Sequence, residues 1–238
     1  MRENNIDYIA SSVLFEDNHI IIINKRSSEI VQGDKTGDTP LSEKVKLYIK
    51  EKYEKPGNVY LGVVHRIDRP VSGIVIFART DKALTRLNNM LRDKEISKKY
   101  WAVVKNKPPA EAGNLKNYIK KNEANNKSYI LQEGDKGFKE AQYAELNYRL
   151  IAQSEQYYLL EVELLTGRHH QIRAQLSEIG CPIKGDVKYG ANRTNPDASI
   201  HLHARSIRFI HPVSKQEVYI VAPPPAESLW DYFRAILG

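Results

Sequence analysis

The chain has 238 residues and a formal net charge of +7, and 41% of its residues are hydrophobic. This length suits one large domain with a sizeable core. No apolar run approaches the roughly 18 residues of a membrane span, and residues 1–5 open no signal-like apolar stretch. Cys181 is the only cysteine, which excludes an intrachain disulfide and a thiolate zinc cluster and fits a reducing compartment. We therefore expect a cytoplasmic protein with no membrane segment.

Positive charge is concentrated in one part of the chain. Between Arg92 and Lys127 there are ten Lys or Arg residues and four Asp or Glu residues. Basic side chains gathered in one region suit a polyanionic partner, because neutralising phosphates releases their counterions. A solvated, Lys-rich surface would have the same composition. The charge alone therefore leaves both interpretations open.

The hydrophobic pattern predicts more strands than helices, and most of the strands follow one another directly. After an N-terminal lead-in (1–12), we expect a single domain at 13–238, with an exposed loop or β-extension at 105–139. Expected strands cover 13–15, 20–23, 61–64, 73–78, 100–104, 144–150, 157–165, 202–210 and 217–221, and expected helices cover 41–53, the segment after Thr80, 169–179 and 227–237. This order favours an α+β fold built on a largely antiparallel mixed sheet with flanking helices.

The segment after Thr80 has a clear helix start. Thr is a favourable N-cap residue, because its side-chain oxygen can accept a hydrogen bond from a free backbone N–H of the first turn. Helical spacing then places Leu84, Leu87 and Leu91 on one face, which we expect to be the buried face.

The helix expected at 169–179 is amphipathic. Its inward residues are Ile172, Leu176 and Ile179, and Gly180 marks its end. Arg173 lies one step round the helix, at the margin of the inward face.

Several common catalytic signatures are missing. The sequence contains no glycine-rich phosphate loop, no dinucleotide fingerprint and no glycine-flanked nucleophilic serine. His169–His170 and the His201-x-His203 pair invite a metal interpretation, but no cysteine or glutamate accompanies either pair at ligand spacing. We therefore expect no metal site.

A compact polar turn joins the strands expected at 61–64 and 73–78. Residues 65–73 read H-R-I-D-R-P-V-S-G, so Asp68 stands among His65, Arg66 and Arg69. Neighbouring cations favour an ionised carboxylate, and an arginine can orient a carboxylate that acts as a nucleophile or base. From the residues alone, a turn or capping role is the more usual one for an aspartate at such a place.

The segment at 65–73 resembles the H-R-L-D-x-x-T-S-G signature of the RluA-type RNA pseudouridine synthases, whose aspartate is catalytic. Four further segments resemble motifs of this family in the same order. They are S-K-K-Y at 97–100 (K-x-Y), L-T-G-R-H-H-Q-I-R-A-Q-L at 165–176 (G-R-x-H-Q-I-R), 182–190 (P-I-x-G-D…Y-G) and H-L-H-A at 201–204 (L-H-A). The likeness runs from about Val13 to Val221, and five ordered motifs are far more specific than one.

The resemblance implies the pseudouridine synthase catalytic fold with a central active-site cleft. It implies an isomerase that flips specific uridines out of structured ribosomal or transfer RNA, cleaves the glycosidic bond and re-attaches uracil through carbon 5. Asp68 would be the catalytic carboxylate, Tyr100 the ring on which uracil stacks, and Arg173 the partner of Asp68. The reaction has no redox change or energy input, so we expect no cofactor, and we expect a monomer.

RNA contacts are expected around these residues. His65 and Arg66 would fill the vacated stack and hold the flanking phosphates, because a base inside a helix must be flipped out to react. Arg168 precedes a helix and would contact phosphate. The remaining expected RNA contacts are Gln171, Lys25, Lys98 and Lys99.

The sequence departs from the family at several positions. Ile67 and Val71 replace the usual leucine and threonine of the H-R-L-D-x-x-T-S-G signature. Residues 24–29 read N-K-R-S-S-E where the family usually has N-K-P-x-G. No separate N-terminal RNA-binding domain is expected, so RNA would be gripped by the catalytic domain. The rival function is a non-catalytic RNA-binding or ribosome-assembly factor on the same scaffold, which would not need Asp68, Tyr100 and Arg173.

Overall fold

The computed structural model describes residues 2–34 and 36–237. The chain divides into two compact units, each described here by itself. The first comprises residues 1–96 and 204–224, and the second comprises residues 97–203 and 225–238.

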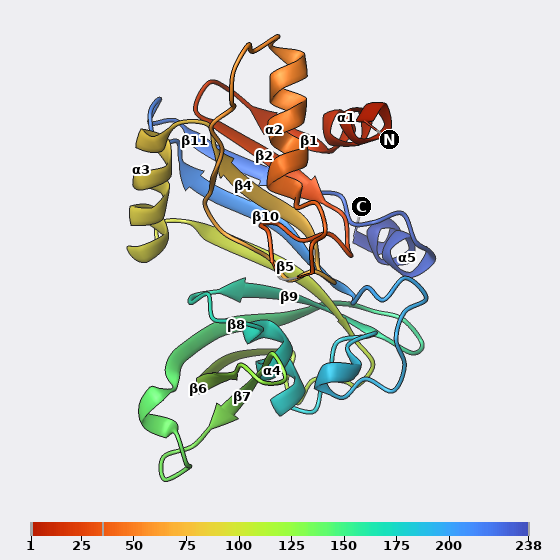
Figure 1. The fold of residues 1–238 in the computed structure, drawn as a ribbon. Coiled ribbons are helices and arrows are strands. Elements are labelled where there is room, and N and C mark those ends of the chain that lie inside the picture. Colours follow the sequence, from red (N-terminus) through yellow and green to blue (C-terminus); the bar gives the residue numbers. More distant parts are fainter. Residues whose placement is uncertain (1, 35, 238) are drawn as a thin grey trace. The chain divides into compact units, whose positions relative to one another are not determined.

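The first unit is a small sheet with three helices (Figure 1), in which the pairs β1–β2, β2–β4, β3–β4 and β10–β11 are antiparallel. Its strands run in the order β1-β2-β4-β10, with β3 paired to β4 and β11 to β10. The elements are α1 (Arg2–Ser12), β1 (Val13–Glu16), β2 (Ile20–Lys25), α2 (Leu41–Lys52), β3 (Gly62–Val63), β4 (Ser72–Ala78), α3 (Asp81–Arg92), β10 (Leu202–Ile210) and β11 (Glu217–Val221). Helix α1 occupies the segment expected to be a lead-in.

The two central strands of this unit are buried along almost their whole length. Residues Ile20–Ile23 of β2 are 0% exposed, and all seven residues of β4 are buried. Ile22 pairs with Ile76 in an antiparallel register. Strands that are covered on both faces require continuous apolar runs, which is why these two segments carry no polar alternation.

Helix α3 begins as predicted, and its buried face contains the expected Leu87 but is shifted towards Ala83 and Met90. The Thr80 hydroxyl accepts a hydrogen bond from the Ala83 N–H, and the buried residues are Ala83, Leu87 and Met90. The expected face was Leu84, Leu87 and Leu91. Leu84 instead packs at the edge of the helix over Gly62, where an added Cβ would lie 2.7 Å from a Leu84 methyl carbon.

The second unit is an antiparallel sheet in the order β5-β9-β8-β6-β7; Figure 1 draws β5 in yellow-green and its neighbour β9 in teal. The predicted β-extension is the β6–β7 hairpin. The elements are β5 (Ser97–Val104), β6 (Ala112–Asn122), β7 (Lys127–Leu131), η1 (Phe138–Glu140), β8 (Gln142–Gln153), β9 (Tyr158–Leu164), α4 (Gln171–Glu178), η2 (Val187–Tyr189) and α5 (Ser228–Leu237). The prediction of an α+β fold on a largely antiparallel sheet is confirmed.

Each face of this second sheet is covered by a helix. Trp230 and Phe233 of α5 pack in one cluster with Trp101, Val103 and Leu159. Ala174 of α4 packs with Ile119 and Ala144 on the other face. Because side chains alternate along a strand, Tyr100 points to the face opposite Trp101, which is the face that α4 covers.

Helix α4 starts two residues later than predicted. His170 has a left-handed conformation (φ 53°) immediately before Gln171, which prevents the helix from extending back to His169. At the other end Gly180 has φ 76°, as expected of a glycine that terminates a helix. None of the helices in the described part of the chain combines the length and apolar character of a membrane span.

Candidate active site

Asp68 lies in the tight turn between β3 and β4. The Val71 N–H donates to the Asp68 carbonyl at 3.0 Å, which closes the turn, and the Asp68 side chain is half-buried. Gly73, at the end of this turn, has φ 110°, and an added Cβ would lie 2.4 Å from the Ala204 carbonyl oxygen. Both the conformation and the close backbone approach require glycine here. The turn is thus fixed against β10 within the first unit.

Lys25 stabilises this turn through hydrogen bonds from its buried ammonium. Its side chain is 1% exposed, and its ammonium donates to the carbonyl oxygens of Arg26 (2.9 Å), Glu29 (2.8 Å) and Arg69 (3.2 Å). Burial lowers the pKa of Lys25 to about 7, while Glu29 and Asp68 act in the opposite direction. Three carbonyls already occupy the three N–H donors, which argues against the direct RNA contact predicted for Lys25.

The loop that departs from the family pattern keeps its turn by other means. Ser28 takes the place of the usual glycine in a left-handed conformation (φ 69°), and its N–H donates to the Arg69 carbonyl at 2.8 Å. Arg26 takes the place of the proline, and its guanidinium carbon lies 3.9 Å from the centre of the Tyr8 ring. Helix α1, which carries Tyr8, therefore braces the altered loop.

The cations beside Asp68 have different surroundings. Arg69 donates to the Asp38 carboxylate at 2.6 Å and to the Thr36 hydroxyl at 2.8 Å. Arg66 is exposed and has no hydrogen bond or ion pair to another residue in the described ranges. His65 is half-buried, and its Nε2 accepts from the Ile76 N–H at 3.3 Å. Of these side chains, Arg66 is the most exposed and is available for a ligand.

Tyr100 and Arg173 belong to the second unit. Tyr100 is buried in β5 opposite Val162 of β9. Arg173, expected at a helix margin, is instead buried within α4. Its Nε lies 2.7 Å from Asp186 Oδ2 and its Nη2 lies 2.8 Å from Asp186 Oδ1. This bidentate pair fixes the guanidinium plane. The pairing of Arg173 with Asp68 stays a prediction.

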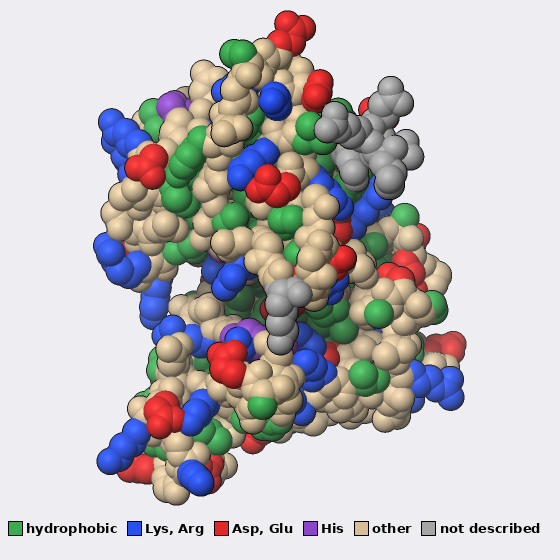
Figure 2. Space-filling view, in the orientation of Figure 1, with side chains coloured by type: hydrophobic (Ala, Val, Ile, Leu, Met, Phe, Trp, Pro, Cys, Tyr) green, Lys and Arg blue, Asp and Glu red, His purple; other side chains and the backbone are tan. Residues whose placement is uncertain are grey.

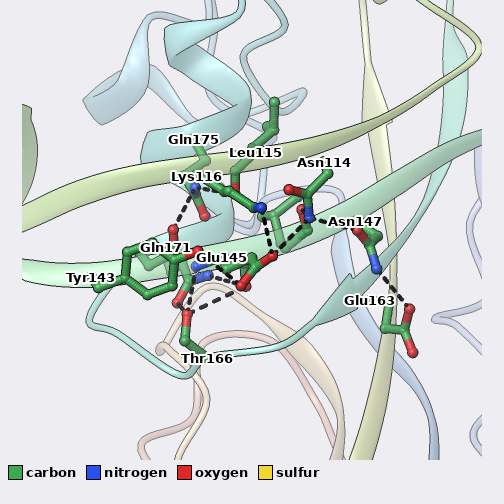
Figure 3. A network of polar contacts seen from close by, with 12 residues as sticks. Asn114, Leu115, Lys116, Tyr143, Glu145, Asn147, Glu163, Thr166, Gln171 and Gln175 are labelled. Carbon is green, nitrogen blue, oxygen red and sulfur yellow. Dashed lines mark hydrogen bonds and ion pairs between the residues drawn. The ribbon is translucent and has the colours of Figure 1, made fainter.

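A polar network holds the loop before α4 (Figure 3). The Gln171 side-chain oxygen accepts from the Thr166 hydroxyl and from the Arg168 N–H, and its amide group donates to the Glu145 carbonyl. Thr166 also accepts from the Glu145 N–H at 2.8 Å. Gln171 is 3% exposed, so its amide ties the loop to β8, and this placement argues against the RNA contact predicted for it.

Arg168 lies on the outside of the same loop. Its side chain is exposed, and its Nε donates to the Tyr143 carbonyl at 2.9 Å. One hydrogen bond orients the side chain and leaves other N–H groups of the guanidinium for phosphate, because arginine carries five donors. The phosphate contact predicted for Arg168 is therefore compatible with its position.

A second buried cluster lies at the start of α4. The Tyr189 hydroxyl accepts from the Ser128 N–H at 2.8 Å and lies 2.9 Å from His170 Nδ1. Burial lowers the pKa of His170 to about 2, with Arg173 acting in the same direction. The His169 ring stacks on His170 with centroids 3.7 Å apart. His170 is thus a neutral packing residue.

Lys98 and Lys99 are both half-buried and have different surroundings. Burial lowers the pKa of Lys98, and its Nζ lies 3.7 Å from where a Cβ would stand on Gly167. Lys99 forms an ion pair with Glu161 on the neighbouring strand at 3.0 Å. Lys98 therefore lies beside the loop that precedes α4, within the second unit.

Several lysines of the basic segment (92–127) form ion pairs with carboxylates, so the segment carries less unpaired positive charge than its sequence suggests. Lys120 pairs with Glu140, Lys121 with Glu123 at 2.6 Å, and Lys116 lies 3.7 Å from Glu145. Figure 2 accordingly shows blue and red side chains interspersed over the β6–β7 hairpin and η1. Phosphate binding by these lysines would compete with existing pairs.

Asp186 is the site residue that the sequence left unassigned. It falls in the P-I-x-G-D motif, which follows the motif that contains Arg173, and the order of these two motifs is the sequence signal that could have suggested the pair. Tyr189 and Ser128 were likewise unassigned, because only the folded chain brings 128 next to 170 and 189.

Comparisons with known proteins identify the family to which the chain belongs. The sequence model described as RNA pseudouridylate synthase matches residues 19–178. Ribosomal large subunit pseudouridine synthase C of Buchnera aphidicola subsp. Acyrthosiphon pisum is 32% identical over 227 residues, which cover 92% of this chain and 69% of that protein. The synthase C of Vibrio cholerae is 30% identical over 89% of this chain and 65% of its own length. The chain thus spans about two thirds of these relatives.

A solved structure shows the same fold. The structure titled Human RNA Pseudouridylate Synthase Domain Containing 4 is similar with a TM-score of 0.80, at 22% sequence identity, over 98% of this chain and 96% of that one. A second, titled Human RNA Pseudouridylate Synthase Domain Containing 1, has a TM-score of 0.69 at 19% identity and covers 95% of this chain and 94% of that one.

Proposed function

Because the chain belongs to the RNA pseudouridylate synthase family, in its RluA-type branch, we propose that it isomerises uridine in RNA with Asp68 as the essential carboxylate. The observation that carries this proposal is the family match over 19–178, which includes Asp68, Tyr100 and Arg173. The five ordered motifs support the same assignment. The rival function, a non-catalytic RNA-binding factor, is not favoured by relatives that are named as synthases.

In the proposed reaction the bond between the ribose and uracil N1 breaks, uracil turns, and a bond forms between the ribose and carbon 5. Carbon 5 loses its proton and N1 gains one, so the product is an isomer of uridine. Asp68 assists cleavage and holds the detached sugar. Tyr100 supplies the ring against which uracil stacks, and its hydroxyl accepts a proton at the ribose. With an ordinary pKa near 10, a tyrosine acts as a base only where its surroundings stabilise the phenolate.

Arg173 is proposed to orient Asp68 through its charge. Its support is the buried pair with Asp186, which fixes the guanidinium plane through two hydrogen bonds. An arginine held in this way needs little reorganisation when a carboxylate has to be aligned for chemistry.

The substrate is proposed to be ribosomal RNA. This rests on relatives whose printed names state the ribosomal large subunit; transfer RNA is the second candidate. Arg66, which is exposed and unpaired among the described residues, is proposed to enter the space that the flipped uridine leaves. Mapping pseudouridines in cellular RNA with and without this gene identifies the target. A monomeric state and a cytoplasmic location stay predictions.

The decisive test is Asp68→Asn. The amide keeps the size of the side chain and its capacity for hydrogen bonds, but it loses the charge that makes a carboxylate a nucleophile or base. We expect no detectable pseudouridine and an RNA affinity within about tenfold of wild type, or about 1.4 kcal/mol. A melting curve separates loss of chemistry from loss of fold.

The matched control is Asp93→Asn, at an exposed aspartate that pairs with Arg92. Its activity should equal that of the wild type. Substantial turnover by folded Asp68→Asn protein would remove Asp68 from the chemistry. Loss of RNA binding with normal turnover per bound RNA would make Asp68 a structural residue.

A further inference from the structure

A pocket of about 580 Å³ lies within the second unit, lined by the end of β5, the turn before β9 and the loop 182–196. None of the residues that line it belongs to the predicted catalytic or RNA-contacting set. Its charged lining residues are Lys105, Lys184 and Arg193, and no Asp or Glu lines it. A pocket of this volume is within the usual range of small-molecule sites.

The floor of the pocket is rigidly built. The Lys184 N–H donates to the Val103 carbonyl at 2.9 Å, and the Lys184 carbonyl accepts from the His201 N–H at 2.9 Å. Next to it, Gly185 has φ 88°, and an added Cβ would lie 2.8 Å from both the Asn195 side-chain amide and the Ser199 carbonyl oxygen. The backbone of Lys184 is therefore held on β5, and the absence of a side chain on Gly185 lets the loop 195–199 close against it.

Hydrogen bonds with buried side chains position the Lys184 ammonium. Lys184 Nζ donates to Asn195 Oδ1 at 2.9 Å and lies 3.4 Å from His201 Nδ1, to which the Asn195 amide is also close at 3.0 Å. His201 Nε2 lies 3.0 Å from the Glu227 carboxylate. Asn195 and His201 are 7% and 4% exposed. With Nδ1 as the acceptor, His201 carries its proton on Nε2 and donates it to Glu227.

Positive charge in the pocket is not compensated by ion pairs. Lys105, Lys184 and Arg193 form no ion pair with a carboxylate in the part of the chain that the structure describes. Burial lowers the pKa of Lys184, against the attraction of Glu227 and Asp197. A bound anion would reverse this effect, because an opposite charge nearby favours the ammonium. The two hydrogen bonds of Lys184 leave its third N–H for a ligand.

An aromatic ring completes the pocket. Tyr157 is half-buried, lines the pocket, and its ring centre lies 6.0 Å from Lys184 Nζ. Asn106 and Gln156, which also line the pocket, offer both donors and acceptors. A planar base can stack on such a ring, which is a sequence-tolerant way to hold a nucleotide.

We propose that this pocket binds a phosphate-bearing nucleotide, with the phosphate on Lys184, Arg193 and Lys105 and the base beside Tyr157. The phosphate can belong to a free nucleotide or to a nucleotide of an RNA chain. The proposal does not depend on the catalytic role of Asp68.

The test is calorimetric titration of the full chain with uridine 5′-monophosphate, inorganic phosphate and uridine. Saturable binding of the monophosphate is expected, with uridine at least about tenfold weaker. Lys184→Gln and Arg193→Gln should each weaken binding of the monophosphate at least about tenfold, or about 1.4 kcal/mol. Arg193 is exposed and has no hydrogen bond to another described residue, so its variant should fold normally even if Lys184→Gln does not.

The matched control is Lys188→Gln, at an exposed lysine that bonds the carbonyls of Asn125 and Asn126 and does not line the pocket. It should leave the affinity within about twofold, and so should Asp68→Asn. If Arg193→Gln weakens monophosphate and RNA binding together, the site takes a phosphate of the RNA; if only monophosphate binding weakens, it takes a free nucleotide. Absence of saturable binding at millimolar monophosphate, or an affinity unchanged in both Lys184→Gln and Arg193→Gln, would overturn the proposal.

Discussion

Arg173 and Asp186 form a bidentate ion pair inside the second unit, with N–O distances of 2.7 and 2.8 Å. The Arg173 side chain is 6% exposed and that of Asp186 is 0% exposed. Breaking such a pair leaves a buried charge without its compensation, which is far more costly than the loss of an exposed pair. The pair links two motifs of the family, because Arg173 ends the G-R-x-H-Q-I-R motif in α4 and Asp186 ends the P-I-x-G-D motif.

Asp186→Asn should lower the free energy of unfolding by roughly 3–5 kcal/mol, because the buried Arg173 guanidinium then loses the carboxylate charge that it binds through two hydrogen bonds. Denaturant unfolding followed by far-UV circular dichroism measures the change. The control is Asp231→Asn, whose partner Arg234 is half exposed; its effect should be under about 0.5 kcal/mol. Equal effects of the two variants would show that the buried pair contributes no special stability.

Gly73→Ala should destabilise the protein by at least about 3 kcal/mol. The residue has φ 110°, and the added methyl would meet the backbone oxygen, nitrogen and carbon of Ala204 at 2.4 to 2.9 Å, which no side-chain rotation can relieve. Gly57→Ala is the control, since an added Cβ there meets nothing within 4 Å. Thermal and denaturant unfolding of both variants measure the difference. A loss below about 1 kcal/mol in Gly73→Ala would mean that the turn can move away from β10.

The sequence predicted most of the fold because local signals and tertiary packing agree in this chain. The strand at β10 and the strand at β11 have the predicted limits, and Thr80 and Gly180 act as the predicted cap and stop. Helix α1 was missed, because its residues show little amphipathic pattern and its role depends on the contact of Tyr8 with Arg26.

The candidate site was less predictable than the fold. A motif identifies residue types that matter, but it does not say whether a side chain contacts substrate or supports another side chain. Lys25 and Gln171 were expected at RNA, whereas both are buried with their polar atoms bonded to the protein. Arg173 was expected at a helix margin, but the Asp186 carboxylate that draws it inward follows it by 13 residues and reaches it only through the fold.

The buried Lys25 predicts a pH-dependent stability. Its pKa is about 7 in the folded chain and near 10.4 in an unfolded one, so the unfolded state binds more protons between these values. The contribution of Lys25 to the free energy of unfolding therefore rises with pH across this window, with a slope on the order of 1 kcal/mol per pH unit.

Lys25→Met removes this titration. The unfolding free energy of the wild type minus that of Lys25→Met should therefore increase from pH 7 to pH 9. Urea unfolding at each pH measures both values. The exposed Lys50→Met serves as the control and should show the wild-type pH profile. A constant difference across this range would mean that Lys25 keeps its proton in both states.

Arg66→Ala should impair turnover more than RNA binding. Arg66 is exposed two residues before Asp68 and has no hydrogen bond to another described residue, so its removal leaves the turn intact. If its side chain stabilises the flipped-out state, we expect turnover to fall at least about tenfold, or about 1.4 kcal/mol, while RNA affinity stays within about threefold. A fluorescent base analogue beside the target uridine reports flipping directly, and its signal should decrease in Arg66→Ala. Arg92→Ala, at an exposed arginine outside the turn, controls for the loss of one positive charge. Equal flipping in the wild type and in Arg66→Ala would remove Arg66 from this step.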